Sequence, residues 1–340
     1  MKKISVLLAA LAIVATSSCS SDDNKKSDDP YVPKDGAYTN PVIKSSVPDP
    51  TVLRDDDGTY YLYGTEDIHN TPIFKSTDLV NWNLTGTAFT EETRPQMVPG
   101  GGIWAPDIQK IKGKYILYYS KSKWGGEWEC GIGAAVADKP TGPFIDHGKF
   151  FISSEIGVQN SIDPVIYQEN GKVYMFWGSF HGIYGIELTD DGLALAPGAE
   201  KFKISGSYSE GTNIYKHDGY YYLIGSGGSC CEGKNSTYHV VVARSKDLKG
   251  PYVNREGGKA LDNKLDLMLS GSKEVAGPGH NANFVLDDAG NTWMLYHGYD
   301  RFAPNGGRKV FLDRVKWDSD GWPYVDGGKP SVTAEKPVFK

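Results

Sequence analysis

One pattern of polar and apolar residues recurs along the chain: a short polar or acidic start, an apolar strand, a turn that contains glycine, and an aromatic-rich strand. The first copy comprises residues 49–53, a turn at Gly58 and the aromatic run at residues 60–64. Alternating apolar residues on either side of an Asp-Gly or Asn-Gly type turn are typical of a β-hairpin. The pattern therefore predicts one hairpin for each copy.

Five copies of this unit follow one another, and their spacing indicates the architecture. The turn glycines are separated by 55, 58, 48 and 71 residues, and further strand–turn pairs lie between the copies, for example at residues 76–82 and 244–248. About four strands in roughly fifty residues is typical of a propeller blade. One blade cannot bury both of its faces, so the blades are expected to close into a ring. The turn glycines are Gly58, Gly113, Gly171, Gly219 and Gly290.

The sequence thus predicts an all-β fold, a five-bladed β-propeller over residues 40–340, without a long helix and without a second domain. A two-sheet β-sandwich also uses many short strands, but the repeat argues against it. The long last spacing predicts an insertion between Cys230 and Pro278 that forms loops on one face of the ring.

The start of each copy carries the candidate chemistry. The innermost strand of a propeller blade runs along the central channel, so the first residues of the five inner strands meet near one channel mouth. Asp107 is out of step by two positions and is expected to be structural. Three copies of the repeat have a carboxylate at the same position, namely Asp49, Asp163 and Glu210. Turns at the start of a strand do not by themselves explain this recurrence. The full set at this point is Asp49, Asp107, Asp163, Glu210 and His280.

Carboxylates that converge in a partly desolvated channel repel one another. Both effects push their pKa values apart, so that one acid keeps its proton near neutral pH. Hydrolysis of a glycosidic bond needs a protonated acid that faces an ionised one, because one protonates the leaving oxygen and the other handles water or the sugar carbon. The three acids therefore predict a glycoside hydrolase.

Composition agrees with this prediction. The 340 residues are 39% hydrophobic and 23% charged, with 41 Gly, 21 Tyr and 8 Trp. Glycines and aromatics in this proportion favour strands and turns, and aromatic rings also suit the apolar faces of sugars. The net charge of −6 gives no basic surface for nucleic acid, so no nucleic-acid partner is expected.

The N-terminal segment has the order of a signal peptide. Two lysines precede an apolar run at residues 4–14 that is too short to span a membrane, and small residues follow up to Cys19. Residues 1–19 are expected to be a lipoprotein signal peptide that ends at a lipidated Cys19, with ordinary cleavage as the alternative. Residues 20–39 are expected to be a flexible tether, since their first part is polar and acidic.

The acidic residues directly after Cys19 resemble the surface-export signal of Bacteroidetes lipoproteins. This resemblance implies an outer-membrane lipoprotein at the cell surface, with the periplasmic face as the alternative. If Cys19 is lipidated, three cysteines remain, and an odd number leaves one free thiol in an oxidising compartment. The adjacent Cys230 and Cys231 could form a vicinal disulfide, and Cys130 is the third cysteine.

From about residue 40 to 330 the chain resembles glycoside hydrolase family 43, the five-bladed propellers that include arabinanases, arabinofuranosidases and xylosidases. The likeness lies in residues 48–50 (Pro-Asp-Pro), 162–164 (Ile-Asp-Pro) and 210–212 (Glu-Gly-Thr). It implies that Asp49 is the general base, that Glu210 is the general acid, and that Asp163 holds the acid in place and raises its pKa. The family inverts the anomeric centre, which implies roughly 6.5–9.5 Å between base and acid.

Four further segments make endo-1,5-α-L-arabinanases the most similar group within the family: residues 102–107, 176–183, 230–238 and 277–281. The resemblance implies that Trp104, Ser179 and Phe180 bind substrate and that His280 points at an ion in the channel. Gly211 and residues 226–229 depart from the arabinanase pattern, which leaves endo or exo action open.

Some of these residues have a second interpretation. His280 could contact a hydrated calcium ion or form hydrogen bonds at a strand start, and Trp104 could stack on a sugar or plug the channel. His297 and Arg308 are candidates only through their places in the fifth repeat. No organic cofactor is expected.

The resemblance thus implies an inverting, endo-acting hydrolase of α-1,5-linked L-arabinan. Its expected partner is plant cell-wall polysaccharide, in which arabinan forms pectin side chains. One alternative is an exo-acting arabinofuranosidase or xylosidase of the same family. A second is a non-catalytic glycan-binding propeller, in which Asp49→Asn and Glu210→Gln would leave affinity unchanged. A protein-interaction propeller would not need aligned acids. The sequence predicts no oligomeric state.

Overall fold

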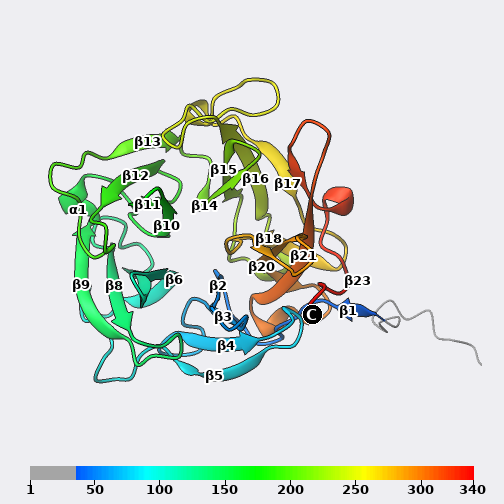
Figure 1. Ribbon diagram of the computed structural model, residues 1–340, viewed down its shortest axis with the longest axis horizontal. Helices are drawn as coiled ribbons and strands as arrows, with labels where there is room; N and C mark the ends of the chain where they lie inside the picture. The colour runs from blue at the N-terminus through cyan, green and yellow to red at the C-terminus, as the bar shows by residue number, and fades with distance from the viewer. Residues whose placement is uncertain (1–35) are drawn as a thin grey trace, which may run out of the picture.

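A computed structural model describes residues 36–340, and Figure 1 shows its strands arranged as a ring of five blades around a central axis. Each blade is an antiparallel sheet whose strands follow one another in the chain. The predicted five-bladed propeller is therefore confirmed. The predictions for residues 1–35, including the lipidated Cys19 and most of the tether, lie outside the described residues.

The first three blades are four-stranded sheets. Blade one contains β2 (Thr51–Arg54), β3 (Tyr60–Tyr63), β4 (Pro72–Ser76) and β5 (Asn83–Thr87). Blade two contains β6 (Gly102–Ile111), β7 (Lys114–Ser122), β8 (Gly131–Ala137) and β9 (Ile145–Ile152). Blade three contains β10 (Val165–Glu169), β11 (Lys172–Trp177), β12 (Ile183–Leu188) and β13 (Phe202–Ser205).

The last two blades complete the ring. Blade four contains β14 (Glu210–His217), β15 (Tyr220–Gly227), β16 (His239–Ser245) and β17 (Asp266–Leu269). In blade five, β18 and β19 both pair with β20. Its strands are β18 (Val275–Gly279), β19 (Val285–Leu286), β20 (Thr292–Asp300), β21 (Lys309–Trp317) and β22 (Pro323–Tyr324).

Helical structure in residues 36–340 is limited to single turns. None of these helices is long and apolar enough to cross a membrane. They are α1 (Ser153–Ile156) and the 3₁₀ turns η1 (Gly233–Asn235), η2 (Ala260–Asp262), η3 (Pro304–Gly306) and η4 (Asp326–Gly328).

The predicted hairpin turns are present. Gly58 and the four turn glycines that correspond to it in the other blades all have φ between 74° and 85°. A residue with a Cβ rarely adopts this left-handed conformation, so glycine is the natural choice at these turns.

The hydrophobic core lies between the blades. The buried apolar residues of the described chain form five clusters, and each cluster joins two neighbouring blades. Along β7, for example, Leu117 and Tyr119 pack toward blade one, whereas Ile116 and Tyr118 pack toward blade three. This period-2 alternation buries both faces of the sheet, which one blade alone could not do.

The first described residues close the ring between blades five and one. β1 (Ala37–Thr39) pairs with β23 (Thr333–Glu335), and Figure 1 shows β1 beside the C-terminal end. Asn40 Nδ2 donates a hydrogen bond to the Leu312 carbonyl (2.8 Å), and Leu312 N–H donates to Asn40 Oδ1 (2.9 Å). Residues 37–39, which were assigned to the tether, therefore form a strand of the folded domain.

The extra residues of the last repeat lie in two connections rather than in loops on one face. Residues 228–238 join β15 to β16, and residues 246–265 join β16 to β17. Because successive antiparallel strands connect at opposite ends of a sheet, only the first connection begins on the side where the inner strands start. The prediction of an insertion on one face was wrong in this respect.

One residue at the entrance of each inner strand has a left-handed backbone that bends the chain. For a residue with a Cβ this conformation costs about 1 kcal/mol. Asp107 lies two residues after the bend of blade two, as expected, whereas the alignment was wrong in blade four, where Glu210 lies one residue before the bend. The five bend residues are Asp49 (φ 53°), Ala105 (39°), Asp163 (59°), Gly211 (56°) and His280 (45°).

The neighbouring blade binds the N–H group of most bend residues. Four of them donate to a side chain seven residues after the turn glycine of the preceding blade. Blade three has Gly178 at that place, and Gly211 N–H donates instead to Asp163 Oδ2 (3.1 Å). The four bonds join Asp49 to His297 Nδ1 (3.0 Å), Ala105 to Thr65 Oγ1 (2.8 Å), Asp163 to Ser120 Oγ (2.8 Å) and His280 to Ser226 Oγ (2.8 Å).

Candidate active site

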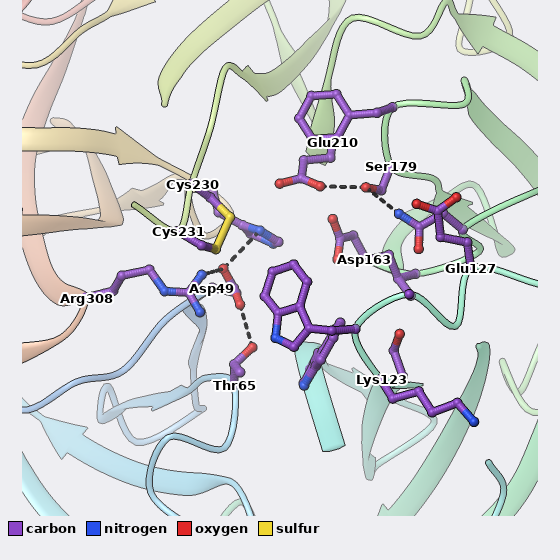
Figure 2. Close-up of a pocket in the computed structure, with 18 of the residues that line it drawn as sticks. Asp49, Thr65, Lys123, Glu127, Asp163, Ser179, Glu210, Cys230, Cys231 and Arg308 are labelled. Atoms are coloured by element: carbon purple, nitrogen blue, oxygen red, sulfur yellow. Dashed lines mark hydrogen bonds and ion pairs between the residues drawn. A yellow bond between two sulfur atoms is a disulfide. The ribbon is translucent and has the colours of Figure 1, made fainter. Parts of the chain in front are cut away.

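A cavity of about 320 Å³ lies where the inner strands begin. Asp49, Asp163 and Glu210 all line it, and Figure 2 shows their side chains around one shared space. The ring of blades therefore brings together three carboxylates from three blades that are distant in sequence.

Asp49 is buried among cationic and hydroxyl groups. Arg308 Nη1 lies 3.2 Å and His280 Nδ1 3.3 Å from Asp49 Oδ1, and Thr65 Oγ1 donates a hydrogen bond of 2.5 Å to Oδ2. Burial raises the pKa of Asp49, but the charge of Arg308, followed by His280, outweighs burial and holds the pKa well below its usual value. Asp49 is therefore ionised at neutral pH, as a general base must be.

His297 is fully buried beside Asp49 and is neutral at neutral pH. Burial lowers the pKa of His297 to about 4. Its Nδ1 accepts the hydrogen bond from Asp49 N–H, so Nδ1 has no proton to donate to Asp49 Oδ1, which is 3.1 Å away. The Tyr238 ring stacks on His297 with 5.5 Å between centroids. His297 thus fixes the Asp49 backbone, whereas Arg308 stabilises the carboxylate charge.

Asp163 and Glu210 form a pair of buried carboxyls that retains a proton. Burial, followed by the charges of Glu210 and Asp49, raises the pKa of Asp163 well above its usual value. Burial also raises the pKa of Glu210. Two close carboxyls that cannot both ionise share one proton near neutral pH. The site therefore combines an ionised carboxylate and a protonated carboxyl pair, which is the combination that glycosidic bond hydrolysis requires.

Glu210 is held by hydroxyl groups from two blades. Ser179 Oγ donates to Oε2 (2.5 Å) and Tyr238 OH donates to Oε1 (2.9 Å), while Asn160 Nδ2 donates to Ser179 Oγ (2.9 Å). Ser179, which was expected to bind substrate, lines the cavity but uses its hydroxyl to orient Glu210. Asp163 reaches the acid through the backbone, because its Oδ2 accepts the N–H of the next residue, Gly211.

Trp104 and Phe180, the other predicted substrate-binding residues, also line the cavity. The Trp104 ring lies 5.4 Å from that of Trp124, which is 78% exposed. Trp104 therefore faces the cavity together with a second indole, and this position allows stacking on a sugar ring. Sequence reasoning missed Trp124, which lies in the connection after β7.

The channel below the carboxylates narrows to a cavity of about 20 Å³ that His280 helps to line. It has room for about one water molecule. Three buried oxygen atoms there have no hydrogen-bond partner within residues 36–340: Thr212 Oγ1, Asn213 Oδ1 and Asn281 Oδ1. Such neutral oxygens suit a bound water.

Within the described residues there is no group of three or more His, Cys, Asp or Glu side chains that could hold a metal ion. The calcium ion predicted near His280 is therefore without support, and the His280 ring faces the Asp49 carboxylate instead.

Asp107 has a structural role, as expected. Thr51 Oγ1 of blade one donates to its Oδ1 (3.0 Å), and Ile166 N–H of blade three donates to its Oδ2 (2.8 Å). Burial raises the pKa of Asp107 to about 7. Asp107 thus joins three inner strands without lining the larger cavity.

Several site residues were missed or only suggested by the sequence. Arg308 and His297, suggested by their places in the fifth repeat, both contact Asp49. Thr65 had a usable signal, because a hydroxyl residue returns seven positions after two other turn glycines. Tyr238 and Asn160 lie in connections outside the repeat, where no periodic signal marks them.

The cysteines of the described chain have two different environments. Cys230 and Cys231 form a vicinal disulfide that lines the cavity (Figure 2). Cys130 is a buried free thiol 3.1 Å from Ser153 Oγ.

The chain is similar to known proteins over most of its length. It is 34% identical to the extracellular exo-α-(1→5)-L-arabinofuranosidase ArbA of Cellvibrio japonicus, over 82% of this chain and 86% of that protein. It is 32% identical to the extracellular endo-α-(1→5)-L-arabinanase 1 of Bacillus subtilis, over 81% of this chain and 86% of that protein.

A solved structure of Cellvibrio cellulosa α-L-arabinanase complexed with arabinohexaose matches with a TM-score of 0.75 and 32% identity, covering 83% of this chain and 96% of that one. The family model described as Glycosyl hydrolases family 43 matches residues 38–323. With the propeller and its three converging carboxylates, these similarities show that the chain belongs to glycosyl hydrolases family 43.

Proposed function

We propose that this protein hydrolyses α-1,5-linked L-arabinan by a single displacement, with Asp49 as general base and Glu210 as general acid. One observation carries the proposal: three buried carboxyl groups share a cavity in which Arg308 helps to keep one ionised, while burial, followed by charge repulsion, keeps a proton on the pair formed by the other two. No organic cofactor is needed for this chemistry.

In the proposed reaction, Asp49 takes a proton from a water molecule as the water oxygen bonds to the anomeric carbon. The bond from that carbon to the leaving oxygen breaks, and Glu210 transfers its proton to the leaving oxygen. Asp163 shares the proton of the buried pair with Glu210 and positions the acid through Gly211 N–H. Ser179 and Tyr238 orient the Glu210 carboxyl.

Inversion of the anomeric centre follows if water attacks from the face opposite the leaving group. Proton NMR of the first product, recorded before mutarotation, tests this. A product with the same anomeric configuration as the substrate would contradict the single displacement.

The substrate is proposed from the relatives. Two of them are named for action on α-(1→5)-L-arabinose linkages, and a similar solved structure is a complex with arabinohexaose. We propose endo action, and exo action is the second candidate because the relative ArbA is named an exo enzyme. The early products from linear arabinan separate them. An endo enzyme releases a ladder of oligosaccharides and lowers viscosity quickly, whereas an exo enzyme releases one short product.

Variants of the two proposed catalytic residues test the chemistry directly. Asp49→Asn should abolish turnover of arabinan and of aryl arabinofuranosides. Glu210→Gln should abolish turnover of arabinan but retain turnover of a dinitrophenyl arabinofuranoside, since that leaving group departs without a proton. Asp57→Asn, at an exposed turn, is the matched control. Equal losses on both substrates for Glu210→Gln would contradict its role as acid.

We further propose that the protein is anchored by lipid on Cys19 at the outer membrane and faces the cell surface, where plant cell-wall polysaccharide is accessible. The sequence order of residues 1–23 supports this proposal. Cys19→Ala should move the protein from the membrane fraction to the soluble fraction. Protease treatment of intact cells should degrade the wild-type protein, and protection would place it on the periplasmic face.

A further inference from the structure

The disulfide between Cys230 and Cys231 is part of the cavity wall. Both residues line the same cavity as the three carboxylates, and Cys231 is exposed while Cys230 is half-buried. Figure 2 shows the two sulfur atoms on the Arg308 side of the cavity, with Glu127 and Lys123 on the opposite side. A ligand in the cavity can therefore touch this disulfide.

Stability gives little reason for a disulfide at this place. A disulfide stabilises a fold chiefly by closing a long loop of the unfolded chain, and this one closes the shortest loop there is. The connection of residues 228–238 is also held by other contacts. Ser229 N–H donates to Thr237 Oγ1 (3.1 Å), Glu232 N–H donates to Ser236 Oγ (2.9 Å), and Arg301 Nη1 donates to the carbonyl oxygen at position 234 (2.5 Å).

We propose that the Cys230–Cys231 disulfide is a substrate-binding surface, on which the apolar C–H face of one arabinose ring packs. This rests on the proposed function. Paired sulfur atoms are soft and polarisable, and they present no strong hydrogen-bonding group, so they suit C–H groups. The neighbouring Arg308 can serve the sugar hydroxyls. A site that combines an apolar wall with a few polar groups is typical of ligand pockets.

A second role must be separated from this one, because the same connection ends at Tyr238, whose hydroxyl binds Glu210. If the disulfide only positioned Tyr238, its removal would change the ionisation of the acid. The basic limb of the pH profile of kcat/KM would then move. A binding surface predicts a higher KM with the basic limb in place.

Isothermal titration calorimetry with arabinohexaose tests the proposal in the binding-competent but inactive Glu210→Gln protein. The double substitution Cys230→Ala/Cys231→Ala should raise the dissociation constant about tenfold. Lys234→Ala, an exposed side chain on the same connection, should leave it within about twofold. If the double variant fails to fold, phosphine reduction of the Glu210→Gln protein to two thiols, verified by thiol titration, replaces it.

An unchanged dissociation constant after either removal or reduction of the disulfide would overturn the proposal. A shifted basic limb in the double variant with Glu210 intact would overturn it too, in favour of a positioning role. Turnover of arabinan by the wild-type protein is measured separately, so a failure of the proposed function is distinguished from a failure of this inference.

Discussion

Replacement of Arg308 by methionine tests the charge arrangement on which the proposed base depends. Arg308 Nη1 lies 3.2 Å from Asp49 Oδ1, and the Arg308 side chain is 15% exposed. At this separation and an effective dielectric constant of about 20, two unit charges attract by about 5 kcal/mol. Water that enters the vacated space recovers part of this, and we expect Arg308→Met to raise the pKa of Asp49.

The expected result is a one-sided change in the pH profile. The base acts only when ionised, so the acidic limb of kcat/KM against pH moves to higher pH, while the basic limb, which reports the acid, stays in place. Initial rates on a soluble arabino-oligosaccharide measure both limbs, with circular dichroism at each pH to verify folding. His280 and His297 also face Asp49, and burial lowers the pKa of both, whereas the Arg308 guanidinium is permanently charged.

Arg308→Met should also lower the free energy of unfolding at neutral pH. The pKa of Asp49 is depressed in the folded protein, so its ionisation stabilises the fold above the usual carboxyl pKa, and this contribution is lost as pH falls through the depressed value. Arg308→Met removes that contribution at neutral pH, whereas Arg308→Lys keeps the charge and should move the acidic limb less. An acidic limb that does not move in Arg308→Met would refute the reasoning.

Four further substitutions probe the acid, the bend and the ring of hydrogen bonds. Tyr238→Phe removes a donor to Glu210 and should lower kcat about tenfold in steady-state assays and raise the basic limb, because that hydrogen bond lowers the pKa of the acid. Gly211→Ala places a Cβ 2.9 Å from a neighbouring imidazole ring at φ 56°, and should cost about 1–3 kcal/mol in urea unfolding; unchanged stability would contradict this. Thr65→Val and Ser226→Ala each leave a bend N–H unpaired and should cost about 1–3 kcal/mol, but only Thr65→Val should also shift the acidic limb, since only this hydroxyl donates to the base.

The ring of blades could be predicted because its cause is local. Turn glycines recur with hairpin patterning, and a sheet with two apolar faces must be covered on both sides. The first residues of the inner strands were harder to align from the sequence, because regular strand pairing is interrupted there. Ladder register shifts between Trp104 and Asp107 and between Glu210 and Asn213, which are the segments that contain the bends.

The five repeats were aligned on their acidic residues, and this alignment hid the regular spacing between the bend residue and the turn glycine. Eight residues before the turn glycine, the middle three blades have Ala105, Asp163 and Gly211, which are their bend residues. Side-chain contacts across blades, such as Ser179 with Glu210, depend on the closed ring and leave no mark in a single hairpin. Loop residues such as Tyr238 could be located only from the three-dimensional structure.

The position of the acid follows from the crowding at the bend of blade four. A side chain at Gly211 would collide with the His280 ring, so no carboxylate can occupy the bend there as Asp49 and Asp163 do in their blades. The proposed acid is the preceding residue, Glu210, which lies about 3.4 Å nearer the N-terminus along an extended strand. Inverting hydrolysis needs a base and an acid that are far enough apart for a water molecule as well as the sugar. The one-residue offset in blade four thus gives Glu210 a place in its strand that differs from the place of Asp49 and Asp163 in theirs.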